Sequence, residues 1–276
     1  MANLRAIRMR IKSVESTRQI TKSMKMVAAA KLRKTQTAAS RLHSFAEKSE
    51  EILLALGGAV GAAGNPYLRP IAEEGKLCYV LIVGNRGLCG TYNHSLLRYF
   101  EQLRAEESRE SLLYVVGRWG RDLITGVDKR LEISDAPSAG EAARLTEELK
   151  KLYDTGEVGE IRLVYQHFHS VLQQSPCVKT LLPLQLPEGG ESRDVICEPD
   201  GESVLTRLLE LTLENQVHSA LLEARTGEHA ARMTAMTSAS DNTEELIQEL
   251  TLELNHARQA AITTEISEIV GGAAAL

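Results

Sequence analysis

Apolar residues recur every three or four positions along the first part of the chain, and no proline or glycine interrupts residues 1–56. This spacing is typical of a helix that buries a single stripe of side chains. Its stripe includes Leu4, Ile7, Ile11, Val14, Met24 and Leu32. Glycine is common just past the end of a helix, so the pair Gly57-Gly58 predicts where this one stops. We therefore expect a first structural part at residues 1–57.

The same three-and-four spacing returns in the last part of the chain, from Glu202 onward. Gly227 is the only glycine inside this second pattern, and Gly271-Gly272 predicts its end. The stripe includes Leu205, Leu209, Leu213, Val217, Met233, Met236, Leu250, Leu254, Ile266 and Ile269. Residues 202–276 are therefore expected to form a second long helix, longer than the first.

Between the two helical patterns the chain changes character, because short apolar runs alternate with helical stretches. Strands are expected at residues 77–83, 112–116, 160–168 and 178–184, with helices at 93–107 and 140–154. Alternation of strands and helices predicts an α/β domain with a largely parallel sheet. Consecutive strand–helix units would make residues 75–200 a central Rossmann-like domain.

Chain order alone predicts how the two long helices meet. The first arrives at the central domain and the last leaves it, so a pair must be antiparallel. The fold class is thus α/β, with a long antiparallel coiled coil of the N- and C-terminal helices beside the central domain. The longer last helix would extend past its partner and leave Ile266, Ile269 and Val270 at an apolar end. An exposed apolar end indicates a binding surface for another protein.

Charge is divided between the two ends of the chain. Residues 1–41 contain eleven Lys or Arg against one acid, whereas residues 202–276 contain twelve acids, four Arg and no Lys. Exposed ion pairs stabilise by only about 0–1 kcal/mol each, so we expect them to set register. A basic helix can also bind nucleic acid, but this one has no aromatic side chain before Phe45 and no leucine zipper after it. Acidic loops of partner proteins are the better target.

The cysteines, the longest apolar stretch and the composition of the N-terminal part indicate the cellular compartment of the protein. Its four cysteines form no CxxC pair, which favours a reduced intracellular compartment and thiols without zinc. The longest uncharged apolar stretch, residues 52–64, is shorter than the roughly 18–20 residues that cross a bilayer. The basic N-terminal part lacks the serine enrichment of a transit peptide. We therefore expect a mature protein on the cytoplasmic side of a bacterial membrane, although an organellar origin stays open.

Two patterns are candidate sites. Residues Gly84, Arg86, Gly87 and Gly90 lie in a glycine-rich loop between a strand and a helix, where a dinucleotide could bind. The spacing GxxGxxG matches neither the dinucleotide fingerprint nor the phosphate-binding loop, so a structural turn is favoured. His167 and His169 would share one face of a strand, but no third metal ligand lies nearby in sequence. We expect no metal, no cofactor and no catalytic residue.

Three stretches resemble the gamma subunit family of F-type ATP synthases. They are Ile20-Thr-Lys-Ser-Met-Lys-Met-Val-Ala-Ala-Ala-Lys31, Asn85-Arg-Gly-Leu-Cys-Gly90 and Ala257-Arg-Gln-Ala-Ala-Ile-Thr263. The resemblance implies a central stalk, one copy per complex, that turns inside a ring of three alpha and three beta subunits. The central domain would contact the epsilon subunit and the ring of c subunits, and ATP would be made or split on beta.

The resemblance also assigns roles to individual residues. By position, the residues that would contact beta are Lys22, Met24, Lys25, Arg258, Gln259 and Thr263. The unpaired apolar end of the longer last helix, with Ile266, Ile269 and Val270, would then be the bearing at the tip of the rotor. Two alternatives remain from the residues themselves. One is a nucleotide-binding α/β enzyme whose helices serve only for oligomerisation, and the other is a coiled-coil scaffold that does not rotate.

Overall fold

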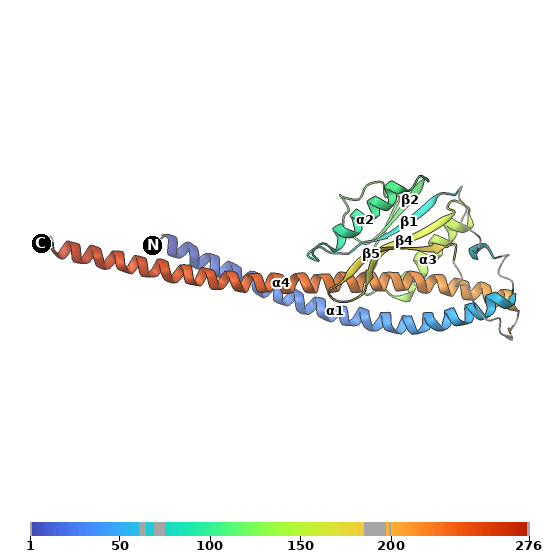
Figure 1. The fold of residues 1–276 in the computed structure, drawn as a ribbon, viewed down its shortest axis with the longest axis horizontal. Coiled ribbons are helices and arrows are strands. Elements are labelled where there is room, and N and C mark those ends of the chain that lie inside the picture. The colour runs from blue at the N-terminus through green and yellow to red at the C-terminus, as the bar shows by residue number, and fades with distance from the viewer. Residues whose placement is uncertain (1, 61–64, 69–74, 185–196, 199, 275–276) are drawn as a thin grey trace. The chain divides into compact units, whose positions relative to one another are not determined.

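The computed structural model describes residues 2–60, 65–68, 75–184, 197–198 and 200–274. The chain divides into two compact units. Unit one contains residues 1–28 and 232–276, and unit two contains residues 29–231. Two long helices, α1 (Ala2–Val60) and α4 (Gly201–Ala274), contribute residues to both units without a break (Figure 1).

Both long helices extend further than their glycines predicted. The first was expected to end at residue 57 but includes Gly57 and Gly58, and the last continues through Gly271 and Gly272. A glycine costs a helix interior only about 1 kcal/mol relative to alanine, which is too little to stop a helix by itself. The start of α4, in contrast, is fixed by an N-cap, because the side chain of Asp200 accepts a hydrogen bond from the backbone N–H of Ser203 at 2.8 Å.

In unit one the two helices run antiparallel, as chain order predicted. Arg18 of α1 forms an ion pair with Glu244 of α4. The predicted stripes are buried at Ile7 of α1 and at Met236 and Leu250 of α4, and Thr21 and Ala28 of α1 are buried as well. The pair between oppositely charged helices fits the expectation that charge sets register.

Unit two contains a five-stranded sheet in the order β3-β2-β1-β4-β5. The strands are β1 (Leu77–Ile82), β2 (Ser111–Val116), β3 (Lys129–Leu131), β4 (Glu160–Phe168) and β5 (Gln174–Leu182). The pairs β1–β2, β1–β4 and β2–β3 are parallel, whereas β4–β5 is antiparallel. The parallel order 3-2-1-4 is Rossmann-like, as expected.

The sheet corrects the sequence prediction at both edges. Strand β3 was missed, because three residues carry no periodicity that could reveal them. The last strand was placed at residues 178–184, but it begins at Gln174 and follows β4 as a hairpin. Pro176 lies within β5. An edge strand tolerates proline because the backbone groups on its outer side form no hydrogen bonds to another strand. The last third of the domain is therefore a hairpin and not another strand–helix unit.

Helices cover both faces of this sheet (Figure 1). Helix α2 (Tyr92–Glu106) packs on one face through Leu96 and Phe100, in one cluster with alternate residues of β1. Helix α3 (Ala139–Asp154), which begins with a capping box at Ser138, shares the other face with the first part of α4. The short 3-10 helix η2 (Pro66–Leu68) adds Tyr67 to that second cluster. Strand β1 is consequently buried on both faces.

Candidate functional site

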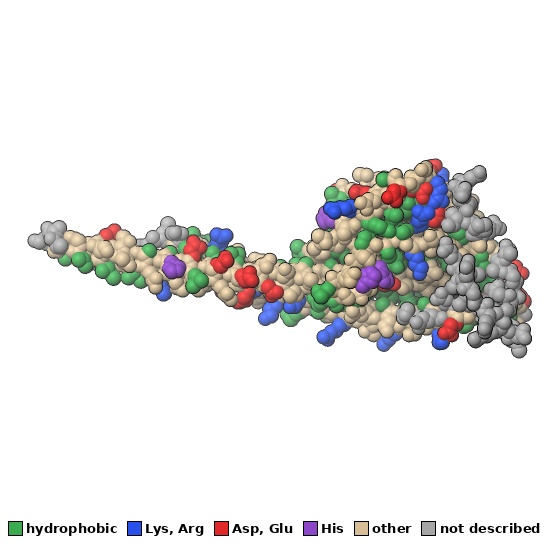
Figure 2. Space-filling model, in the orientation of Figure 1, with side chains coloured by type: hydrophobic (Ala, Val, Ile, Leu, Met, Phe, Trp, Pro, Cys, Tyr) green, Lys and Arg blue, Asp and Glu red, His purple; other side chains and the backbone are tan. Residues whose placement is uncertain are grey.

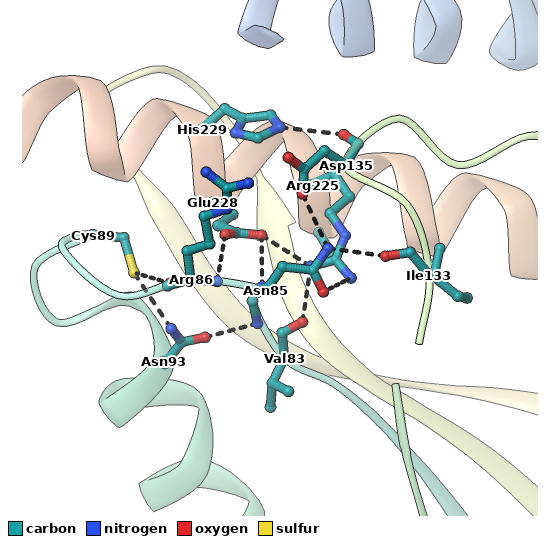
Figure 3. A network of polar contacts seen from close by, with 12 residues as sticks. Val83, Asn85, Arg86, Cys89, Asn93, Ile133, Asp135, Arg225, Glu228 and His229 are labelled. Atoms are coloured by element: carbon teal, nitrogen blue, oxygen red, sulfur yellow. Dashed lines mark hydrogen bonds and ion pairs between the residues drawn. The ribbon is translucent and has the colours of Figure 1, made fainter. Parts of the chain in front are cut away.

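Two buried charges of α4 bind the loop that follows β1 (Figure 3). Glu228 accepts the backbone N–H of Asn85 at 3.2 Å and that of Arg86 at 3.3 Å. Arg225 donates to the carbonyl oxygen of Val83, to the side chain of Asn85 and to Glu228, at 2.9–3.0 Å. The side chains of Arg225 and Glu228 are each 1% exposed. This pair therefore connects the long helix to the carboxyl end of the central strand.

Asn85 extends these contacts to two further segments. Its side-chain amide donates to the carbonyl oxygen of Ile133 at 2.9 Å and to Asp135 at 3.0 Å. The other carboxylate oxygen of Asp135 accepts from Lys31 of α1 at 2.5 Å. We call Lys31, Asn85, Asp135, Arg225 and Glu228 the Asn85 junction. All five lie in unit two, and together they connect α1, α4, the loop after β3 and the end of β1.

The electrostatics of the junction favour ionised Asp135. Partial burial alone raises the pKa of this carboxyl, but hydrogen bonds from Lys31 and Asn85 and the positive charge of Lys31 outweigh it. The pKa of Asp135 consequently lies well below its ordinary value. The ion pair with Lys31 thus persists throughout the neutral pH range.

The loop itself is tightly built around Gly84. The backbone N–H of Gly84 donates to Asn93 at 2.8 Å, and a Cβ at this position would meet Asn93 and Glu228 at 3.0–3.1 Å. Gly90 has φ +58°, a conformation that favours glycine. Cys89 is 3% exposed, and its sulfur lies 3.3 Å from the amide of Asn93. Arg86 and Gly87 are exposed.

The position of Glu228 bears on ligand binding at this loop. In Rossmann-like folds, backbone N–H groups at the carboxyl end of the first strand bind the phosphates of a dinucleotide. Here two such N–H groups, of Asn85 and Arg86, bind the carboxylate of Glu228. The chain's own carboxylate thus lies where an anionic ligand would bind in a nucleotide site.

The residues proposed to contact beta lie in unit one, but they form two separate groups. Lys22, Met24 and Lys25 belong to α1, and Arg258, Gln259 and Thr263 belong to α4. The Arg18–Glu244 pair sets Lys22 opposite α4 residues near 240. Arg258 is about 18 residues further along, or roughly 27 Å. The two groups therefore cannot form one contact site.

The last turns of α4 have no partner helix among the described residues of unit one. Extended from Arg18–Glu244, the register sets the start of α1 opposite residues near Ala260. Ile262, Ile266, Ile269 and Val270 are 48–72% exposed and share one helix face. Figure 2 shows hydrophobic side chains along this projecting segment. An exposed apolar face thus remains where the sequence predicted one.

The described residues contain neither a metal site at the histidine pair nor a membrane-spanning helix. His167 and His169 share a face, with ring centroids 4.5 Å apart, and His167 contacts Glu223 of α4 at 2.6 Å. Within the described residues no group of three or more His, Cys, Asp or Glu side chains could bind a metal ion. No helix in the same part of the chain combines the length and apolar content of a membrane span.

Sequence reasoning missed the junction. Arg225 and Glu228 were counted among the charges of the last helix and were given no role. A signal existed, since Arg225 follows Leu221 by four residues and Glu228 follows Arg225 by three, which continues the buried stripe. Charges on a buried stripe indicate a polar contact inside the fold. Lys31 and Asp135 carried no comparable signal.

Comparisons with known proteins agree along the whole chain. A family model described as ATP synthase matches residues 3–276. The ATP synthase gamma chain of Desulfitobacterium hafniense is 44% identical over 283 residues, and that of Moorella thermoacetica is 45% identical over 285 residues. Each match covers 100% of this chain and 100% of the relative.

Solved structures share the fold. A chain of the Euglena gracilis mitochondrial ATP synthase OSCP/F1/c-ring structure has a TM-score of 0.70 at 21% identity, with 99% of this chain and 94% of that chain covered. A chain of the central stalk/c-ring of the Tetrahymena thermophila mitochondrial ATP synthase has a TM-score of 0.61 at 26% identity, covering 80% of this chain and 99% of that one. The family-model match and the full-length identities show that this chain belongs to the ATP synthase gamma chain family.

Proposed function

We propose that this chain is the central stalk subunit of an F-type ATP synthase. It rotates inside a ring of three alpha and three beta subunits, one copy per complex, and couples ion flow through the c-ring to ATP synthesis or hydrolysis on beta. The names of the full-length relatives and the central stalk title of a solved structure support this proposal. Its location would be peripheral, on the cytoplasmic side of a bacterial membrane.

One observation carries the proposal. Helix α4 is a single 74-residue helix that contributes to both units, about 110 Å long at 1.5 Å per residue. Every turn of an α-helix is hydrogen-bonded to the next, so twist applied at one end of α4 reaches the other. A catalytic domain with oligomerisation arms has no need of one unbroken helix of this length.

The proposed partners fit the exposed surfaces of the described residues. Lys22 and Arg258 are exposed on unit one and would contact beta at two levels along the shaft. Ile266 and Ile269 would form the apolar bearing in the surrounding ring. A rotor changes the affinity of a beta subunit only through contacts that differ between beta conformations. The epsilon and c subunits would contact unit two, and no nucleic acid is involved.

ATP chemistry would take place on beta, with no catalytic site, metal or cofactor in this chain. The rival enzyme hypothesis places a nucleotide at residues 84–90. The carboxylate of Glu228 argues against that hypothesis, because it already binds the two N–H groups that a phosphate would use. Tight binding of ATP, ADP or NAD to the purified chain at one per chain, measured by calorimetric titration, would support the rival.

Rotation can be tested by crosslinking the shaft to its ring. In a complex of this chain with alpha and beta, Gln259→Cys is combined with a cysteine on the facing surface of beta. Oxidation should stop sustained ATP hydrolysis, and reduction should restore it. Gln102→Cys on α2 of unit two, with the same beta variant, is the control that should hydrolyse ATP normally after oxidation. Undiminished hydrolysis in the crosslinked Gln259→Cys complex would support the static scaffold.

A further inference from the structure

The contact between α4 and the sheet changes character along the helix. Its first turns bury large side chains such as Leu209 and Leu213 in the core shared with the sheet. Further along, the buried positions of α4 include the small residues Ala220, Ala224 and Gly227, but also the fully buried Leu221 and Leu222. Small residues form shallow ridges, so their packing resists sliding and turning of a helix less than interdigitated leucines do. Apolar contacts are also non-directional.

The Asn85 junction adds further directional contacts to this packing, beside the bond from the Tyr92 hydroxyl to the Ala224 carbonyl at 2.5 Å and the His167–Glu223 pair at 2.6 Å. Four hydrogen bonds connect α4 to the end of β1: two from backbone N–H groups to Glu228, one from Arg225 to the Val83 carbonyl, and one from Arg225 to the Asn85 side chain. Hydrogen bonds weaken steeply when their angle or distance changes. Three of the four involve peptide groups of a strand end that is itself paired in the sheet. Rotation of α4 about its axis would break all four.

A buried ion pair is poorly explained as a source of stability. Replacing such a pair by apolar side chains of similar volume often leaves stability unchanged or increases it, and the best-attested use of buried charges is to fix one register. Arg225 and Glu228 are 1% exposed, and the buried positions of α4 beside them are partly apolar, such as Ala224, and partly polar, such as Thr226 and His229. We therefore explain the burial of this ion pair by its role in fixing the rotational position of α4 against the sheet, and not by a gain in stability.

The second long helix is connected to the same point. Lys31 of α1 binds Asp135, and Asp135 binds the side chain of Asn85. Asn85 thus receives contacts that originate in both long helices, while its backbone continues directly from β1. A load on either helix can therefore reach the sheet through Asn85, and for α4 also through the peptide groups of Val83 and Arg86.

We infer that the Asn85 junction fastens both long helices to the sheet against rotation, and that Asn85, Arg225 and Glu228 are positioning residues for torque transfer. The inference rests on the proposed rotary function and names the place in unit two where torque would pass between sheet and helices. Loss of the junction should let the helices slip under load, so that ATP is hydrolysed without the full transport of ions.

The test uses the complete ATP synthase containing this chain, reconstituted in lipid vesicles. The informative variant is Arg225→Met combined with Glu228→Met, which keeps side-chain volume and removes the directional bonds. Glu210→Gln is the matched control, because Glu210 is also an α4 acid in an ion pair but binds Lys150 of α3. Ions transported per ATP hydrolysed are measured at increasing opposing ion gradients, together with assembly and thermal unfolding.

The double variant should assemble, unfold below the wild-type temperature because the Val83 carbonyl and the N–H groups of Asn85 and Arg86 lose their partners, and hydrolyse ATP at the wild-type rate without a gradient. Its transport per ATP should fall as the opposing gradient grows, whereas the control should follow the wild type. Wild-type transport per ATP at every gradient would overturn the inference, and so would failure to assemble, which would assign the junction to folding. The Gln259→Cys crosslink separates the two proposals, since undiminished hydrolysis there refutes rotation whatever the junction does.

Discussion

Gly84→Ala adds one methyl group at the most crowded point of the loop after β1. An ideal Cβ there lies 3.0 Å from Oδ1 and 3.1 Å from Nδ2 of Asn93, and 3.1 Å from Cδ of Glu228. None of these atoms can retreat cheaply, since Asn93 accepts the Gly84 N–H and Glu228 accepts those of Asn85 and Arg86. Overpacking of this kind costs about 1–3 kcal/mol.

The same substitution also restricts the unfolded chain, which stabilises by about 0.4–1 kcal/mol. We therefore expect Gly84→Ala to lower the free energy of unfolding by about 1.3 kcal/mol, the difference between the midpoints of these two ranges. Gly87→Ala is the matched control, because no atom lies within 4 Å of a Cβ there and its φ is outside the left-handed range. The control should be neutral or slightly stabilising.

Urea unfolding followed by tryptophan fluorescence measures this difference. The chain has one tryptophan, Trp119, and its backbone N–H donates to the carbonyl oxygen of Gly84 at 3.0 Å. The fluorescence signal therefore reports on the loop itself. Equal unfolding free energies for Gly84→Ala and Gly87→Ala would refute the packing argument, and with it the view that Glu228 is firmly positioned against the loop.

Three further predictions concern pH, register and the anion-like position of Glu228. Hydrogen bonds from Arg109 lower the pKa of Glu107 to about 2 in the folded chain. Since the pKa in the unfolded chain is higher, the free energy of unfolding should fall as pH drops from about 4.5 to 2. Urea unfolding of Glu107→Gln should show a smaller fall over the same pH range. Arg18→Ala removes an exposed pair with Glu244 and should change the free energy of unfolding by less than about 1 kcal/mol, measured by the helical circular dichroism signal; a larger loss would show that this pair stabilises as well as aligns the helices. Glu228→Ala should destabilise unit two by about 3–5 kcal/mol. Formate, which carries the missing carboxylate, should raise the urea concentration at the unfolding midpoint of this variant part of the way back to the wild-type value, whereas chloride at equal ionic strength should not. Identical midpoints in the two salts would argue against an anion site at this loop.

The long helices could be predicted because a three-and-four spacing maintained over dozens of residues matches the helical repeat and not the two-residue repeat of a strand. Their ends could not, since a glycine such as Gly58 or Gly271 costs less than the hydrogen bonds of a continuing helix provide. Strand β3 escaped for a related reason, because Lys129–Leu131 is defined only by its pairing with β2. The periodicity of a sequence therefore predicts well that a long helix is present, but predicts poorly where the helix begins and ends.

The junction shows a different limit. The type of Arg225 and Glu228 is visible in the sequence, but their burial depends on the loop after β1, about 140 positions earlier. A single sequence does not show which segment lies opposite a helix face. The spacing of the two charges on a buried stripe was the one available indication, and it identifies a polar contact without its partner.

The burial of Cys89 gives this fold a built-in kinetic probe. Its thiol lies in the loop bound by Glu228, within reach of the Asn93 amide, and is 3% exposed. A thiol reagent reaches such a group only when the surrounding structure opens, so the labelling rate measures the frequency of that opening. With Cys78 replaced by alanine and the half-buried Cys177 and Cys197 by serine, Cys89 is the one remaining thiol, and its labelling rate would measure how often the loop opens while the chain remains folded.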